Sequence, residues 1–100
     1  MNLKKIKKYA EELELLLKHY SKIENDASKL YDSLKEIISQ AKQEKITTPL
    51  EYSDIPGSYF FNERNLANYR DLSKSYSTFK LEVTGGDDEY GELRKLVKSM

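Results

Sequence analysis

The sequence predicts a small all-α protein, a helical bundle in which a long N-terminal helical segment is packed by one or two shorter C-terminal helices. Three observations lead to this prediction. Residues 2–45 contain neither glycine nor proline, apolar residues recur there at helical spacing, and a second run of apolar residues at steps of three and four begins at Asn62. We expect residues 1–100 to form a single helical domain, since a chain of this length buries one modest core.

The apolar residues of the segment 2–45 fall on three rows, each with a step of seven residues. Three apolar positions in seven make the broad stripe of a bundle helix, which is wider than the seam of a two-stranded coiled coil. Glu24 is the single polar member of the first row. The first row is Leu3, Ala10, Leu17, Tyr31 and Ile38, the second is Ile6, Leu13, Tyr20, Ala27, Leu34 and Ala41, and the third is Tyr9, Leu16, Ile23, Leu30 and Ile37.

Two arrangements of this segment are open. As one helix it would be about 60–65 Å long, whereas a compact domain of this size has a radius of gyration of about 13 Å. A break near residues 24–28, with Asn25, Asp26 or Ser28 as the cap of a second helix, would give an antiparallel hairpin. The three rows keep their register across residues 23–31 and no glycine marks a turn, so the sequence favours one continuous helix, its exposed end covered by a second subunit.

Residues 46–61 are expected to form a connector loop. Pro49 ends the preceding helix, because proline clashes with the helical turn before it. The sequence from Ile55 to Ser58 suits a type II turn, with Gly57 at the position that requires a positive φ. The turn is surrounded by an unusual density of apolar side chains: Tyr52, Ile55, Tyr59, Phe60 and Phe61.

Residues 62–84 are expected to form the second helical region, and residues 87–99 a short terminal helix. Residues 79–84 also alternate as a half-buried strand would, but no partner strand follows, so helix is favoured. The pair Gly85-Gly86 ends the region. The apolar positions of the second region are Leu66, Tyr69, Leu72, Tyr76, Phe79 and Val83, and those of the terminal helix are Tyr90, Leu93, Val97 and Met100.

Composition narrows the classes of function. Lysine plus arginine and aspartate plus glutamate number 17 each, so the basic excess typical of nucleic-acid-binding proteins is missing and no nucleic-acid partner is expected. The chain has no cysteine, which excludes disulfides and removes the usual zinc ligands. No apolar run approaches the roughly 20 residues that span a bilayer, and no signal peptide is recognisable. We therefore expect a cytoplasmic protein without a membrane span.

No catalytic, metal or cofactor motif stands out. His19 is the only histidine, and the acids nearest to it at helical spacing, Glu12 and Asp26, are two turns away, so a solvated surface histidine is expected. Glu24 must be paired, exposed at a turn or facing a partner, because an unpaired buried carboxylate is costly. Its position favours a hairpin turn or an open interface, and the alternative is a polar residue that fixes register between subunits.

An acidic run near the end of the chain does not have the spacing of a calcium loop and is explained by helix capping. This run consists of Asp87, Asp88, Glu89 and Glu92. Without a phosphate loop or a nucleophile motif, we expect a non-enzymatic protein with no metal and no cofactor.

The remaining hypothesis is a helical protein-binding module that self-associates as a homodimer or binds another protein. One concrete role in this class is a small intracellular inhibitor or immunity-type protein. The candidate partner-binding residues are Tyr52, Ile55, Tyr59, Phe60 and Phe61, unless these fold back over the bundle. The candidate self-association residues are Leu13, Leu17, Tyr20, Glu24, Tyr31 and Leu34. The alternative function is binding of nucleic acid or an anionic membrane surface through Lys4, Lys5, Lys7 and Lys8, although four lysines on one helix are more often a solvated face.

Overall fold

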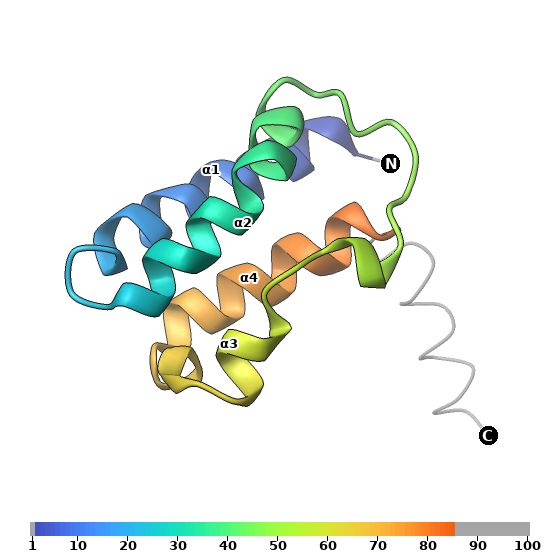
Figure 1. Cartoon of the computed structure of the whole chain (residues 1–100). Coiled ribbons are helices and arrows are strands. Elements are labelled where there is room, and N and C mark those ends of the chain that lie inside the picture. The colour runs from blue at the N-terminus through green and yellow to red at the C-terminus, as the bar shows by residue number, and fades with distance from the viewer. Residues whose placement is uncertain (1, 86–100) are drawn as a thin grey trace.

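The computed structural model of the protein describes residues 2–85, and within them it is helical with no strand. The predicted all-α bundle is confirmed (Figure 1). The terminal helix expected at residues 87–99 lies outside the described residues. The elements are α1 (Leu3–Tyr20), α2 (Asn25–Lys42), the 3-10 turn η1 (Tyr52–Asp54), α3 (Ser58–Asn62), the 3-10 turn η2 (Asn65–Asn68) and α4 (Arg70–Val83).

The N-terminal segment is a hairpin, so the favoured prediction of one continuous helix was wrong. Helix α1 ends at Tyr20, and α2 runs back beside it from Asn25 (Figure 1). The chain reverses at a single extended residue, Glu24, with φ −137° and ψ 115°. Helix-like hydrogen bonding continues up to Glu24, whose amide donates a hydrogen bond of 2.7 Å to the Tyr20 carbonyl four residues earlier.

The caps of these helices differ from those expected. The N-cap of α2 is Glu24, whose side chain makes no capping hydrogen bond, rather than Asn25, Asp26 or Ser28. Asp26 lies in the first turn of α2, where a negative charge is favoured by the helix dipole. Its carboxylate is buried and accepts a hydrogen bond of 3.1 Å from Arg64 Nε. Glu24 thus lies in the hairpin turn, which is one of the two positions that its place in the apolar row favoured.

Helix α4 packs against α1 in the antiparallel direction. Tyr20 at the end of α1 contacts Asp71 at the start of α4, and Lys5 at the start of α1 lies 4.0 Å from Glu82 near the end of α4. The residues 79–83 that could have formed a strand belong to α4. Helix α1 thus packs against both α2 and α4.

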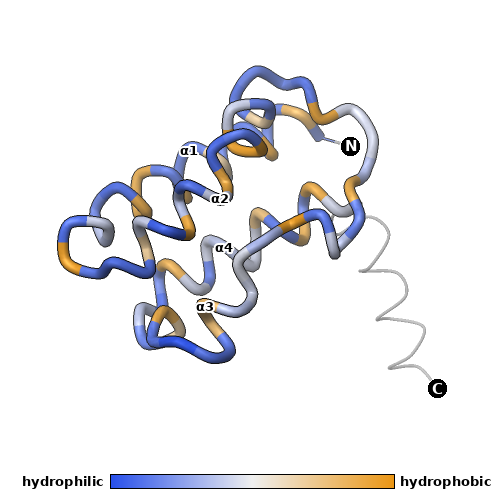
Figure 2. The backbone as a smooth tube through the Cα atoms, in the orientation of Figure 1, coloured by the Kyte–Doolittle hydropathy of each residue, from blue (hydrophilic) through white to orange (hydrophobic). Residues whose placement is uncertain are grey.

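The core consists of the apolar stripes of these three helices, closed by side chains from the connections. Figure 2 shows hydrophobic positions recurring between hydrophilic ones along each helix. Of the three predicted rows, only Ile23, in the turn between α1 and α2, is exposed. The buried apolar residues are Ile6, Ala10, Leu13 and Leu17 from α1, Ala27, Leu30, Leu34, Ile38 and Ala41 from α2, Leu72, Tyr76, Phe79 and Val83 from α4, and Ile46, Ile55 and Leu66 between helices.

The connector runs along α4 and carries more helix than the sequence indicated. Its first part is tied to the end of α4 by a 2.9 Å hydrogen bond from the Leu50 amide to the Val83 carbonyl. Gly57 has φ +114°, which confirms the positive φ expected for the turn. The five residues of α3 follow it directly, and α4 begins at Arg70 rather than at Asn62. None of the helices within residues 2–85 is long and apolar enough to cross a membrane.

Candidate protein-binding groove

An open groove of about 600 Å³ lies between α1 and α4. Its α1 side presents Tyr9, Glu12 and Leu16, which are three and four residues apart and so lie on one face of the helix. Its α4 side presents Asp71, Ser75 and Thr78 at the same spacing. Because the two helices are antiparallel, these two rows face each other along the groove.

Two of the α4 residues that line the groove, Ser75 and Thr78, have short side chains. On the α1 side, Leu15 is 71% exposed, and Tyr9 and Leu16 are half-buried. In a chain of which 34% is charged, this is a concentrated apolar surface.

The charges at the groove are unequal in sign. Glu12 and Asp71 are acidic, whereas Lys74 is the one basic residue among the described residues that line the groove. Asp71 is fixed in position, since its Oδ1 accepts hydrogen bonds from the Tyr20 hydroxyl at 2.7 Å and from the Leu72 amide at 2.8 Å. This hydrogen bond to Asp71 raises the pKa of Tyr20.

The residues predicted for self-association are covered within one chain. Leu13, Leu17 and Leu34 are fully buried in the core. Tyr20 and Tyr31 are half-buried, and the hydroxyl of Tyr31 donates a hydrogen bond of 2.9 Å to Glu14. The apolar rows of the N-terminal segment are thus buried by packing between helices of the same chain. Self-association remains a prediction, and these residues offer little exposed apolar surface for it.

Glu24, the remaining member of that set, is half-buried at the reversal between α1 and α2. Its carboxylate accepts a hydrogen bond of 3.3 Å from the hydroxyl of Tyr69. The ring of Tyr69 lies 4.5 Å from that of Tyr20. Glu24 therefore joins the hairpin turn to the start of α4.

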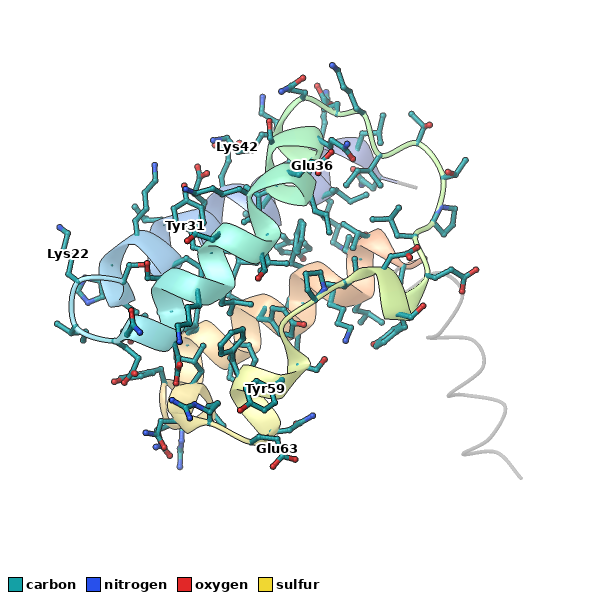
Figure 3. All side chains as sticks on the ribbon, in the orientation of Figure 1. Lys22, Tyr31, Glu36, Lys42, Tyr59 and Glu63 are labelled. Carbon is teal, nitrogen blue, oxygen red and sulfur yellow. The ribbon has the colours of Figure 1, made fainter. Side chains whose placement is uncertain are left out.

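The residues predicted for partner binding are divided between core and surface. Ile55 is buried, and Phe60 and Phe61 are half-buried against the core. Tyr52 and Tyr59 are 49% and 58% exposed, and Figure 3 shows Tyr59 at the outer side of α3. Most of this set folds back over the bundle, and only Tyr52 and Tyr59 of the five are exposed.

The N-terminal lysines lie among acids. Lys4, Lys7 and Lys8 are exposed on α1, but the surface around them also includes Glu11, Glu12 and Glu44. The local positive charge is therefore reduced. His19 is exposed, as expected, with its ring 5.0 Å from that of Tyr20.

Within residues 2–85, no group of three or more histidine, aspartate or glutamate side chains is placed to hold a metal ion. The acidic run at residues 87–92 lies outside the described residues.

The sequence did not point to the groove, although one signal for it exists. Leu15 is an apolar residue of α1 that belongs to none of the three rows, within the run from Leu13 to Leu17. Because the three rows already supply the residues that face the core, an additional apolar residue such as Leu15 is expected on the surface of α1. No protein family, curated protein or solved structure matches the chain significantly.

Proposed function

We propose that this protein is a non-enzymatic binding module that holds one amphipathic helix of another protein in the groove between α1 and α4. The observation that carries the proposal is the exposure of Leu15 beside Tyr9 and Leu16. Burying a side chain such as leucine contributes about 1.5–3 kcal/mol. A partner that covers these three side chains would therefore gain most of its binding energy here.

The dimensions of the groove support a helix as the occupant. From Tyr9 to Leu16 the floor follows about 10 Å of α1, or two helical turns. Two turns accommodate anchor residues at steps of three and four from one helix, which is the usual mode of helix-in-groove recognition. The two acids and one lysine at the groove favour a partner with basic residues beside its apolar stripe.

One role in this class is inhibition. If the bound helix belongs to an enzyme or a toxin, its sequestration would block that protein's activity, which is the inhibitor or immunity-type role that the sequence suggested. We base the proposal on the groove rather than on the N-terminal lysines, because of the acids that lie among those lysines.

Site-specific crosslinking tests the proposal. The chain has no cysteine, so a Leu15→Cys variant takes a crosslinker at one position only. An Ile23→Cys variant is the matched control, because Ile23 is also a highly exposed aliphatic residue but lies in the hairpin turn away from the groove. Each labelled protein is added to an extract of its source cells, and the crosslinked peptides are sequenced.

The expected result is a crosslink from position 15, and not from position 23, to an amphipathic helix with basic flanking residues. A synthetic peptide of that helix should bind the unmodified protein, and Leu15→Asp should weaken this binding at least about tenfold. Equal crosslinking at both positions, or peptide binding unaffected by Leu15→Asp, would contradict the proposal.

A further inference from the structure

A second pocket, separate from the groove, lies where α3 and η1 meet α4, and we name it the Lys80 pocket. Its volume is about 330 Å³. Ser73, Ser77 and Lys80 line it from α4, and because they are four and three residues apart they share one face of that helix. Tyr52 and Ser58 add hydroxyl groups from the connector.

The Lys80 pocket differs from other pockets on the described surface in having no acidic residue in its lining. Three other pockets each contain at least one lysine but also at least two acids. In a chain with 17 aspartates and glutamates, a described lining that has a lysine and no acid favours an anionic ligand. Its other polar groups are neutral hydroxyls and an amide, which donate hydrogen bonds to an anion without opposing its charge.

Lys80 itself has no counterion among residues 2–85 and is held in place by neutral groups. Its Nζ donates a hydrogen bond of 2.8 Å to Ser58 Oγ and lies 4.6 Å from the centre of the Tyr52 ring and 5.8 Å from that of Tyr76. No carboxylate of residues 2–85 forms an ion pair with it. An ammonium group has three donors, so two remain for a ligand.

Aromatic rings form an apolar side of the same pocket. Phe61 stacks on Tyr76 at 4.6 Å between ring centres, and Tyr76 is fixed by a hydrogen bond of 2.8 Å from its hydroxyl to the Pro56 carbonyl. Tyr52 is half exposed, which leaves part of its ring open to a ligand. A rigid ring surface beside a cation suits a ligand that has a flat group next to its charge.

We propose that the Lys80 pocket binds a small aromatic phosphate monoester, with the phosphate at Lys80, Ser58 and Ser77 and the ring against Tyr52. A phosphate dianion offers three acceptor oxygens to these donors, whereas a carboxylate offers two. This ligand site goes beyond the helix-binding function and does not depend on it.

Binding of phenyl phosphate to the full chain, followed by NMR, tests the inference. We expect saturable shifts of the backbone amides at residues 58, 77 and 80, weaker binding of inorganic phosphate and of benzoate, and no saturable shifts with phenol. Lys80→Gln, which keeps the length and removes the charge, should weaken phenyl phosphate binding at least about tenfold, since a charge-assisted hydrogen bond is lost. Lys80→Arg should retain it.

Two further variants control for folding and for general charge effects. Ser77 is exposed, so Ser77→Glu leaves the core intact while placing a carboxylate at the pocket, and it should abolish binding. Lys35→Gln is the matched control, because Lys35 also lies over a tyrosine ring, that of Tyr31 at 5.2 Å, but pairs with Asp32 outside the pocket. Absence of saturable binding, equal loss in Lys35→Gln and Lys80→Gln, or unchanged binding in Ser77→Glu would overturn the inference.

Discussion

The hydroxyl of Tyr76 on α4 donates a hydrogen bond of 2.8 Å to the backbone carbonyl of Pro56 in the connector. Tyr76 is 4% exposed, so this bond forms largely out of contact with water. It joins residues 20 apart in the sequence and holds the turn at Pro56 and Gly57 against α4. A hydroxyl of α4 is therefore one of the groups that hold the connector in place.

Removing this hydroxyl should loosen the connector without opening the core. Tyr76→Phe keeps the ring that stacks on Phe61 but leaves the Pro56 carbonyl without its donor. We expect a loss of about 1–1.5 kcal/mol in the free energy of unfolding, the usual contribution of one hydrogen bond. Urea denaturation at neutral pH measures it. An unchanged midpoint would mean that water replaces the hydroxyl without cost.

Gly57 should tolerate no side chain. Its φ of +114° is unfavourable for any L-residue, and a Cβ atom there would overlap with Leu30 Cδ1 and lie 3.3 Å from the Tyr76 ring. Gly57→Ala should therefore lower the free energy of unfolding by about 2–4 kcal/mol, from backbone strain and overpacking together. Thermal unfolding followed by circular dichroism measures the effect. Ala67→Gly, at an exposed position of η2, is a control for a change of similar size, and equal losses in the two variants would contradict the prediction.

The aromatic connector shows what the sequence could and could not predict. The turn at Gly57 was predictable, because only glycine suits the third position of a type II turn after proline. The sequence could not predict that Ile55 is buried whereas Tyr52 and Tyr59 are exposed, since this depends on where α4 lies relative to the connector. The sequence indicated an apolar cluster but had no information on which of its members face inward.

The hairpin was missed for a physical reason. The reversal between α1 and α2 occupies residues 21–24, about as many residues as one helical turn. The apolar rows therefore resume in register after the reversal, so that preserved register could not distinguish a turn from a continuous helix. Leu15 was overlooked for a related reason, because the rows explain only the apolar residues that face the core.

Glu14 should stabilise the hairpin at neutral pH and lose this effect in acid. Its carboxylate, on α1, accepts hydrogen bonds from Lys42 at 2.6 Å and from Tyr31 at 2.9 Å, both of which extend from α2 toward α1 (Figure 3). The hydrogen bond from Lys42 is the main cause of a pKa lowered from the ordinary 4.5 of Glu14, opposed in part by burial. The folded chain therefore favours the ionised carboxylate.

The sign of the pH dependence follows from this lowered pKa. The stabilisation is fully present above pH 4.5, where the carboxylate of the unfolded chain is also ionised, and is lost as the pH falls below 4.5 through the pKa of the folded state. Glu14→Gln should lower the free energy of unfolding by about 1 kcal/mol at pH 7 and by progressively less below pH 4.5. Urea denaturation over this range measures the difference.

Glu36→Gln is the matched control for this measurement. Glu36 is an exposed residue of α2 that forms no ion pair with a described residue (Figure 3). Its substitution should change the stability little at any pH. If Glu14→Gln and the unmodified protein still differ in the free energy of unfolding below pH 4.5, the loss would come from packing of the amide and not from the lost charge, which would contradict the prediction.

Strongly alkaline solution should unfold the protein through its tyrosines. Among the described tyrosines, the fold raises the pKa of four above the ordinary 10.0: a hydrogen bond to Asp71 is the main cause at Tyr20, and burial is the main cause at Tyr31, Tyr69 and Tyr76. A raised pKa means that the fold favours the neutral phenol. Stability is then fully present below pH 10 and decreases as the pH rises above 10, where the unfolded chain ionises first.

Phenolate absorbance followed as a function of pH, with and without urea, tests this expectation. In urea the tyrosines should titrate together near their ordinary pKa of about 10, whereas in the folded protein a part of the absorbance change should appear only at higher pH and coincide with loss of helical circular dichroism. Tyr20→Phe removes one of the four groups, so the decrease in the free energy of unfolding above pH 10 should become less steep. All four pKa shifts arise from contacts between helices or with Asp71, Glu14, Glu24 and the connector. If the titration curves with and without urea coincided, that result would contradict these contacts.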